Sequence, residues 1–239
     1  MTAPLEDRIA GAKSTGAPGA AQRARAGLLV WLRGVQANGT DVVARLADGT
    51  AAAGLGHVAL SGSVPPQGLA CAKGCAFCCI LTGGDGGTMT EAEARALHAA
   101  LAPFAGQPDG RVWHSQACPA LDPVQRMCRA YDTRPMICRS YVSTDVGACE
   151  QVAAGQAAPG PGTLAPYHTY LAALGLSRAA LKGLRRVSTY SLARLAAAAV
   201  EGQPVDAALR AARHKPGELD AELRRSRRDT ARVQQSGLP

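Results

Sequence analysis

Four cysteines within nine residues constrain this chain more than any other feature of its sequence. They lie in the segment Cys71-Ala-Lys-Gly-Cys75-Ala-Phe-Cys78-Cys79. On a continuous helix, this spacing would place all four thiols within roughly 100° of arc. Alternatively, Gly74 breaks the first turn and Cys71 folds back from a loop. In both cases two or three thiolates can converge on one ion, and thiolates select zinc, Cu(I) or iron–sulfur clusters over hard cations.

Four further cysteines follow, each too far from its neighbours for a local chelate: Cys118, Cys128, Cys138 and Cys149. They can complete a metal site only if the chain folds back on the first group. Eight thiols could supply two four-cysteine sites or one site with spare thiols, and their number does not decide between these arrangements. We expect at least three of the four early cysteines to lie beside a later one.

The distribution of apolar residues along the chain predicts the cellular compartment. The chain has no run of 18 or more apolar residues, which argues against a transmembrane helix, and residues 1–27 lack the apolar stretch of a secretory signal. We therefore predict a cytoplasmic protein that does not contact the membrane. In a reducing cytosol, eight cysteines indicate metal or redox chemistry rather than a disulfide framework.

Two arginines flank one of the later cysteines, in the segment Arg134-Pro135-Met-Ile-Cys138-Arg139. Pro135 should open a short helix, with Cys138 and Arg139 on its first turns. A four-thiolate zinc site carries a formal net charge of about −2. Arg134 and Arg139 are placed to offset that charge and to donate hydrogen bonds to sulfur. Either arginine could equally be a surface charge. His114, four residues before Cys118, is a ligand candidate that fits a packing role better.

The order of these motifs resembles the YkgJ-type cysteine-cluster family. The pattern is Cys-x3-Cys-x2-Cys-Cys, then Cys-Pro-x-Leu, then Cys-x2-Tyr-x2-Arg-Pro-x2-Cys-Arg-x-Tyr, then one more cysteine. Members are described as zinc- or iron-chelating proteins, sometimes as iron–sulfur proteins, and some are named flagellin lysine N-methylase-like. In some relatives the first spacing is two residues rather than three, which leaves the metal open.

The resemblance covers residues 70 to 155 and implies a metal-binding protein with zinc, iron or an iron–sulfur cluster. Arg134, Pro135 and Arg139 occupy the family's Arg-Pro and Cys-Arg positions. By position, the implied metal ligands are Cys71, Cys75, Cys78, Cys79, Cys118, Cys128, Cys138 and Cys149.

Three other functions remain open. The spacing from Cys71 to Cys78, with Phe77 before the last cysteine, also matches the signature of radical S-adenosylmethionine enzymes. Such enzymes resemble a β/α barrel, whereas the chain after residue 150 predicts helices without strands between them. A protein methyltransferase is supported by the family name alone. The third alternative is a zinc-stabilised adaptor with a basic helical surface for a partner.

The sequence predicts a mainly α fold, in which a compact cysteine-cluster module with little, short strand precedes a helical C-terminal region. Thr90 and Glu93 form a capping-box pattern for a helix that ends near residue 102. Any strand should lie near Cys128 to Tyr131. Later helices are predicted at about 164–175, 178–201, 204–214 and 217–234. The predicted segments are a disordered N-terminus (1–20), a helical or irregular lead-in and linker (21–69), a cysteine-cluster metal-binding domain (70–155) and a basic helical region (163–239).

The formal net charge is +8, and much of the excess lies between residues 178 and 215. Eight cations there are set against only Glu201 and Asp206: Arg178, Lys182, Arg185, Arg186, Arg194, Arg210, Arg213 and Lys215. Such a surface could bind an acidic protein or nucleic acid. Because no aromatic residues alternate with these charges, a solvated helix face is the simpler interpretation.

Overall fold

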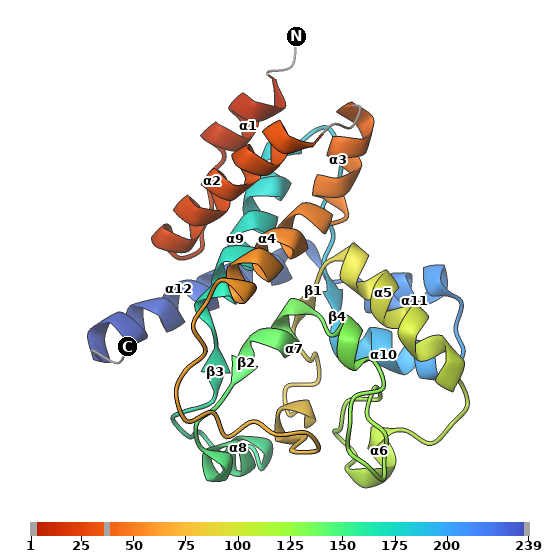
Figure 1. Ribbon diagram of the computed structural model, residues 1–239. Coiled ribbons are helices and arrows are strands. Elements are labelled where there is room, and N and C mark those ends of the chain that lie inside the picture. The colour runs from red at the N-terminus through yellow and green to blue at the C-terminus, as the bar shows by residue number, and fades with distance from the viewer. Residues whose placement is uncertain (1–3, 36–38, 237–239) are drawn as a thin grey trace.

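The computed structural model describes residues 4–35 and 39–236, and these residues are mainly α-helical, as predicted (Figure 1). The α-helices are α1 (Leu5–Gly11), α2 (Pro18–Gly34), α3 (Gly39–Ala47), α4 (Thr50–Ser61), α5 (Glu91–Leu101), α6 (Gly110–Trp113), α7 (Met136–Ser140), α8 (Val146–Ala153), α9 (Ala165–Ala180), α10 (Leu192–Val200), α11 (Val205–Ala212) and α12 (Pro216–Ser236). The 3-10 helices are η1 (Phe77–Cys79), η2 (Ala102–Phe104) and η3 (Tyr131–Thr133), and the strands are β1 (Thr88–Met89), β2 (Tyr141–Val142), β3 (Gly162–Thr163) and β4 (Tyr190–Ser191). None of the described helices is both long and apolar enough to cross a lipid bilayer.

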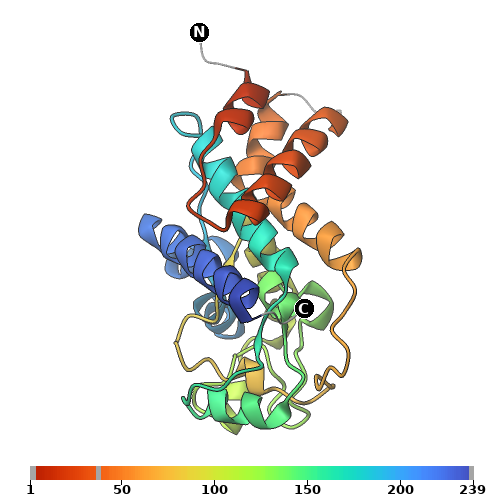
Figure 2. The same ribbon diagram turned by 90° about the vertical axis from the view of Figure 1, so that its left-hand side faces the viewer.

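Helix α9 is the centre of the larger hydrophobic core. Every residue from Pro166 to Ser177 is buried, because leucines, alanines and two tyrosines are distributed around the whole helix. Helices α1, α2, α4 and α12 pack around it. Segments before and after the cysteines therefore share one core. The N-terminal helices lie at one end of the molecule and the cysteine loops at the other, in both views (Figures 1 and 2).

A second core lies between α5, α10 and α11. Leu97 and Leu101 of α5 pack in it with Leu195 of α10 and Leu209 of α11. β1 and β4 form a two-stranded antiparallel sheet with two residue pairs. A segment that follows the cysteine loops in sequence therefore pairs with the strand just before α5. The other two-stranded pair, β2 with β3, leads from α7 into α9.

The buried carboxylate of Glu93 joins both cores to the cysteine region. Thr90 caps α5 in the predicted capping box, and its backbone N–H donates to Glu93 at 2.9 Å. The hydroxyl of Tyr170 on α9 donates to the same carboxylate at 2.6 Å. The backbone N–H of Met136, the first residue of α7, donates to it at 2.8 Å. One side chain therefore fixes α5, α7 and α9 relative to one another.

The structure differs from the sequence prediction in two helical segments. Residues 5–11, expected to be disordered, form α1, because Ile9 is fully buried and α1 packs against α2 and α9. The separate helix expected at 178–201 is absent: residues 178–180 end α9, residues 181–191 are not helical, and α10 covers Leu192–Val200. Gly183 has a φ of +80° beyond the end of α9, and α10 begins only after Ser191 caps it. Residues 1–3, 36–38 and 237–239 of the predicted segments lie outside the described residues.

Candidate metal centre

The first cysteine segment is a loop rather than a continuous helix. Gly74 has a φ of +80° and Ala76 a φ of +33°, and these left-handed conformations interrupt any helical run. Only η1, which contains Cys78 and Cys79, is helical. Of the two alternatives for this segment, the break at Gly74 is therefore the one that the structure has.

Cys118 lies directly against this loop. Its backbone N–H donates to the carbonyl oxygen of Cys79 at 2.7 Å, and Ile80 pairs with Ala117 in an isolated antiparallel bridge. Gly110 lets the start of α6 pack closely on the other side of Cys118, because a Cβ at this position would lie only 2.5 Å from the carbonyl oxygen of Cys118. Two cysteines that are 39 residues apart in sequence are thus adjacent through the backbone.

Cys128 and Cys138 lie on the two segments that follow Cys118 in the sequence. Cys128 pairs with Leu121 in an isolated antiparallel bridge, so extended pairing occurs where a short strand was expected, although the named strands lie elsewhere. Cys138 lies in the middle of α7, and Pro135 is the N-cap of this helix. The predicted short helix after Pro135 is confirmed.

Ser143 holds the start of the first segment close to α8, which carries Cys149. The carbonyl oxygen of Ser143 accepts a hydrogen bond from the backbone of Ala70 at 2.9 Å and lies 3.8 Å from the sulfur of Cys71. Asp145 caps α8 by accepting from the backbone N–H of Ala148 at 3.2 Å. Helix α8 packs against η1, so the last cysteine returns to the first group.

Five thiols form an inner group, defined by Cys78, Cys79, Cys118, Cys128 and Cys138, whose charges influence one another. The pKa of Cys79 lies well above its usual value because its thiol donates to Cys78, because it is buried, and because thiolates at Cys118 and Cys138 would repel its charge. Burial raises the pKa of Cys118 to about 12, with a further contribution from Cys128. Burial also raises the pKa of Cys138, and charge on Cys118 and Cys128 adds to this.

The remaining thiols, Cys71, Cys75 and Cys149, form an outer group. Burial raises the pKa of Cys149, and negative charge at Cys75 and Cys71 raises it further. Cys78 influences Cys149 as well as the inner group and therefore lies between the two. The hydrogen bond from Cys79 lowers the pKa of Cys78 to about 7, which makes Cys78 the thiol most readily ionised among those with a resolved shift.

Comparison with known families agrees with this arrangement. Residues 70–156 match the family model CxxCxxCC, described as "Putative zinc- or iron-chelating domain". We refer to residues 70–156, which match this model, as the CxxCxxCC domain. The match confirms the resemblance that the cysteine order carries, and residues 1–69 and 157–239 lie outside it. No curated protein and no solved structure matches the chain.

The thiols of the CxxCxxCC domain are gathered but not closed into a ligand shell. All eight cysteines are free of disulfides. Within residues 4–35 and 39–236, no three or more His, Cys, Asp or Glu side chains are arranged so that they could already hold a metal ion. The donor set fits zinc or iron, because thiolates are the ligands of four-cysteine zinc and iron–sulfur sites. The sulfurs would have to move together to bind either metal.

The two arginines of the family motif have different surroundings. The guanidinium carbon of Arg134 lies 3.7 Å from the centre of the Tyr131 ring, and the positive charge of Arg134 favours the thiolate forms of Cys78 and Cys128. Arg139 donates to the carbonyl oxygen of Arg134 at 2.6 Å and also to that of Asp132. The Arg139 side chain therefore braces the turn before α7. In the described part of the chain, neither arginine donates a hydrogen bond to sulfur.

Sequence reasoning missed Ser143 and Asp109 as neighbours of the thiols. The Ser143 side chain lowers the pKa of the Cys149 thiol, and the buried Asp109 carboxylate adds to the raised pKa of Cys118. Ser143-Thr-Asp145 before α8 and Asp109-Gly110 before α6 are helix-start signals that could have drawn attention to both. His114 accepts from the backbone N–H of Gln116 at 3.2 Å, which is a local turn contact.

Proposed function

We propose that the CxxCxxCC domain chelates zinc or iron through its eight cysteines and that the metal holds the loops of this domain in place. The observation that carries the proposal is the folding of distant cysteines into two adjoining groups. Cys79, Cys118, Cys128 and Cys138 come from four separate segments, and the backbone bond between Cys79 and Cys118 aligns two of them. The backbone hydrogen bonds from Cys118 to Cys79 and from Ala70 to Ser143 bring cysteine-bearing segments together, which chance burial of small apolar residues would not require.

A division into two four-thiolate sites follows from these groups. The inner site would use Cys79, Cys118, Cys128 and Cys138, and the outer site would use Cys71, Cys75, Cys149 and the intervening Cys78. A bound ion supplies strong metal–sulfur bonds that join distant loops. The chain contributes the ligands, and Arg134 contributes positive charge that offsets the surplus of thiolates.

The small apolar cluster under the first cysteine segment supports a structural role for the metal there, although Cys118 lies in the second core and Cys79, Cys128 and Cys138 pack against it. The hydrophobic cluster beneath the first cysteine segment contains only three buried residues, Ala76, Ala117 and Leu121. Burial of so little apolar surface contributes too little free energy to offset the entropy lost on ordering these loops. Metal binding contributes on the order of 10 kcal/mol to folding in structural thiolate sites.

The test is anaerobic purification followed by elemental analysis and an absorption spectrum. Eight thiols shared among four-thiolate sites give two ions per chain. We expect Cys138→Ser to lose the inner ion and Cys149→Ser the outer one, while His57→Ala, which removes an exposed histidine on α4, keeps both. A visible absorption band would assign iron, and its absence with bound zinc would assign zinc. Protein that retains neither metal, or cysteine variants with unchanged content, would refute the proposal.

The alternative of a radical S-adenosylmethionine enzyme lacks the fold that it requires. After residue 150, the strands in the described chain are β3 and β4, of two residues each, and both pair antiparallel. A β/α barrel needs repeated parallel strands. No described feature favours a methyl-donor site either, so we propose no catalytic activity.

A further inference from the structure

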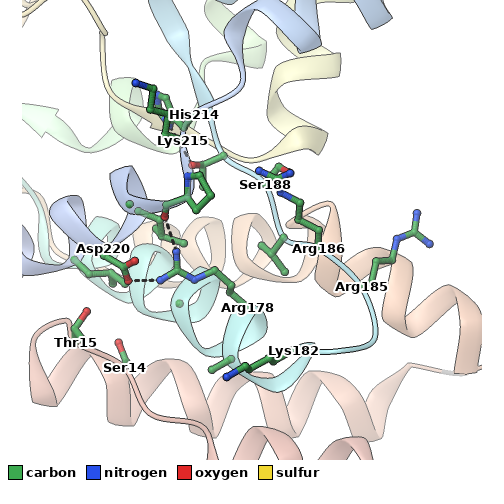
Figure 3. A pocket seen from close by; sticks show the side chains of 18 of the residues that line it. Ser14, Thr15, Arg178, Lys182, Arg185, Arg186, Ser188, His214, Lys215 and Asp220 are labelled. Carbon is green, nitrogen blue, oxygen red and sulfur yellow. Dashed lines mark hydrogen bonds and ion pairs between the residues drawn. The ribbon is translucent and has the colours of Figure 1, made fainter.

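A cavity of about 750 Å³ lies away from the cysteines, between the end of α9 and the start of α12 (Figure 3). The loop after α1, the loop after α9 and the first turns of α12 form its walls, and no cysteine lines it. Sequence analysis identified several of its cations as part of a basic segment, but not that they surround a cavity.

Positive charge dominates the lining of this cavity. Six cations contribute to it: Lys13, Arg178, Lys182, Arg185, Arg186 and Lys215. Asp220 is the single carboxylate among the described residues of the lining, and it pairs with Arg178, which also donates to the carbonyl oxygen of Pro216 at 3.0 Å. In the described structure none of the other five cations has an ion pair. Mutual repulsion of five unpaired cations is unfavourable until an anion enters.

Neutral donors add to this positive field. Helix α12 begins at Pro216, so the positive end of its dipole adjoins the cavity. In its first turn the backbone N–H of Glu218 already donates to the carbonyl oxygen of Lys215 at 3.1 Å. Ser14 and Thr15 line one side, whereas Ser188 and His214 lie at the other end (Figure 3). His214 is held by Asp85 and Thr189, at 3.0 and 3.1 Å, and is therefore part of the wall.

We propose that this cavity binds a small molecule carrying two or more phosphate groups. Arginine forks, lysine ammonium groups and a helix N-terminus are the donors that recognise phosphate oxygens. Several unpaired cations require more than one phosphate to offset them. A nucleic acid strand fits less well, because no aromatic side chain lines the cavity to stack on bases. The proposal does not depend on metal binding by the cysteines.

Isothermal titration of the metal-replete protein with pyrophosphate tests the site. We expect saturable binding of one pyrophosphate, weakened about tenfold by Lys182→Ala or by Arg186→Ala, because each removes a hydrogen bond to a charged group. Both side chains are exposed and lack ion pairs, so their removal should leave the fold intact. Arg210→Ala is the matched control, since it removes one exposed, unpaired cation from α11, outside the cavity.

Pyrophosphate also chelates metals, so metal content is measured after each titration and the affinity is repeated with Cys149→Ser. Unchanged affinity in that variant supports a site separate from the cysteines, even if the proposed metal sites fail. Absence of saturable binding would overturn the proposal, and so would an equal loss of affinity in Arg210→Ala. A single-stranded oligonucleotide that binds more tightly than pyrophosphate would identify a nucleic acid surface instead.

Discussion

Helix α9 is surrounded by the side chains of other helices, whereas the cysteine region is built from loops and from helices α6, α7 and α8, of four to eight residues. Helices this short are not stable without tertiary contacts. The scaffold around α9 has such contacts in a large apolar core. The first cysteine segment packs only on a small cluster, and the later loops reach the second core through Cys118, Ala120 and Ala130. The same chain therefore combines a part that the hydrophobic effect stabilises with a part that, on our proposal, needs metal.

Metal removal should separate the two parts most strongly. On chelation, amide hydrogen exchange should accelerate in residues 70–82 and 114–153, with a loss of protection on the order of 10 kcal/mol or up to the global stability, whichever is smaller. Protection in α9 should change far less, because its core contains no thiol. Equal protection of the cysteine loops with and without metal would show that they are self-sufficient.

Truncation of a side chain in the scaffold core should lower the free energy of unfolding and leave metal binding unchanged. Leu171→Ala removes a fully buried side chain of α9 and should cost about 2–5 kcal/mol in unfolding free energy, through lost burial and the cavity that remains. Metal content per folded chain should stay unchanged. Chemical denaturation of the metal-loaded protein measures the loss, and Val58→Ala, at an exposed position on α4, is the control. A loss of metal in Leu171→Ala would mean that the two parts fold as one unit.

Gly110→Ala tests the cysteine region rather than the scaffold around α9. The added Cβ would lie 2.5 Å from the carbonyl oxygen of Cys118, so the backbone beside a thiol must shift. We expect a cost of about 1–3 kcal/mol, as for other overpacked sites, together with weaker metal retention against a chelator. Gly54→Ala in α4 meets no atom within 4 Å and should be neutral or slightly stabilising. If Gly110→Ala retains metal as wild type does, the close approach to Cys118 is unimportant for the site.

The smallest effect should come from the N-cap of α8. Asp145→Ala removes the acceptor for the Ala148 N–H and should destabilise this helix by about 1 kcal/mol. Since α8 carries Cys149, the outer ion should dissociate faster while the inner ion is retained. Asp145→Asn preserves a capping side chain and should behave like wild type. If wild type, Asp145→Ala and Asp145→Asn all release metal at the same rate, the N-cap of α8 does not contribute to metal retention.

Local signals in the sequence predicted the features that depend on neighbouring residues. The capping box of Thr90 and Glu93 and the short helix after Pro135 need only a few adjacent residues, and both are present. The helix expected at 178–201 was predicted wrongly. The pairing of β4 with β1, about a hundred residues away, holds part of this stretch as strand, and α10 begins only at Leu192. Long-range contacts of this kind leave no periodic signal.

The candidate site shows the same division. Cysteine spacing predicts the candidate ligands, and their part in binding metal stays a prediction. The spacing was compatible with both a helix and a loop for residues 71–79, and backbone geometry at Gly74 and Ala76 distinguishes them. The role of Glu93 beyond its cap was not predictable either. Its contacts with Met136 and Tyr170 join residues 43 and 77 positions away.

The pairing of β1 with β4 has a practical consequence for anyone who would isolate the CxxCxxCC domain. A fragment of residues 70–156 would contain α5 and β1 but neither α10, α11 nor β4. Leu97 and Leu101 would then face water, and β1 would expose an unpaired edge, so the fragment should aggregate. The segment that matches the family model is thus shorter than a fragment that should stay folded. Such a fragment should extend at least to Ala212, the end of α11.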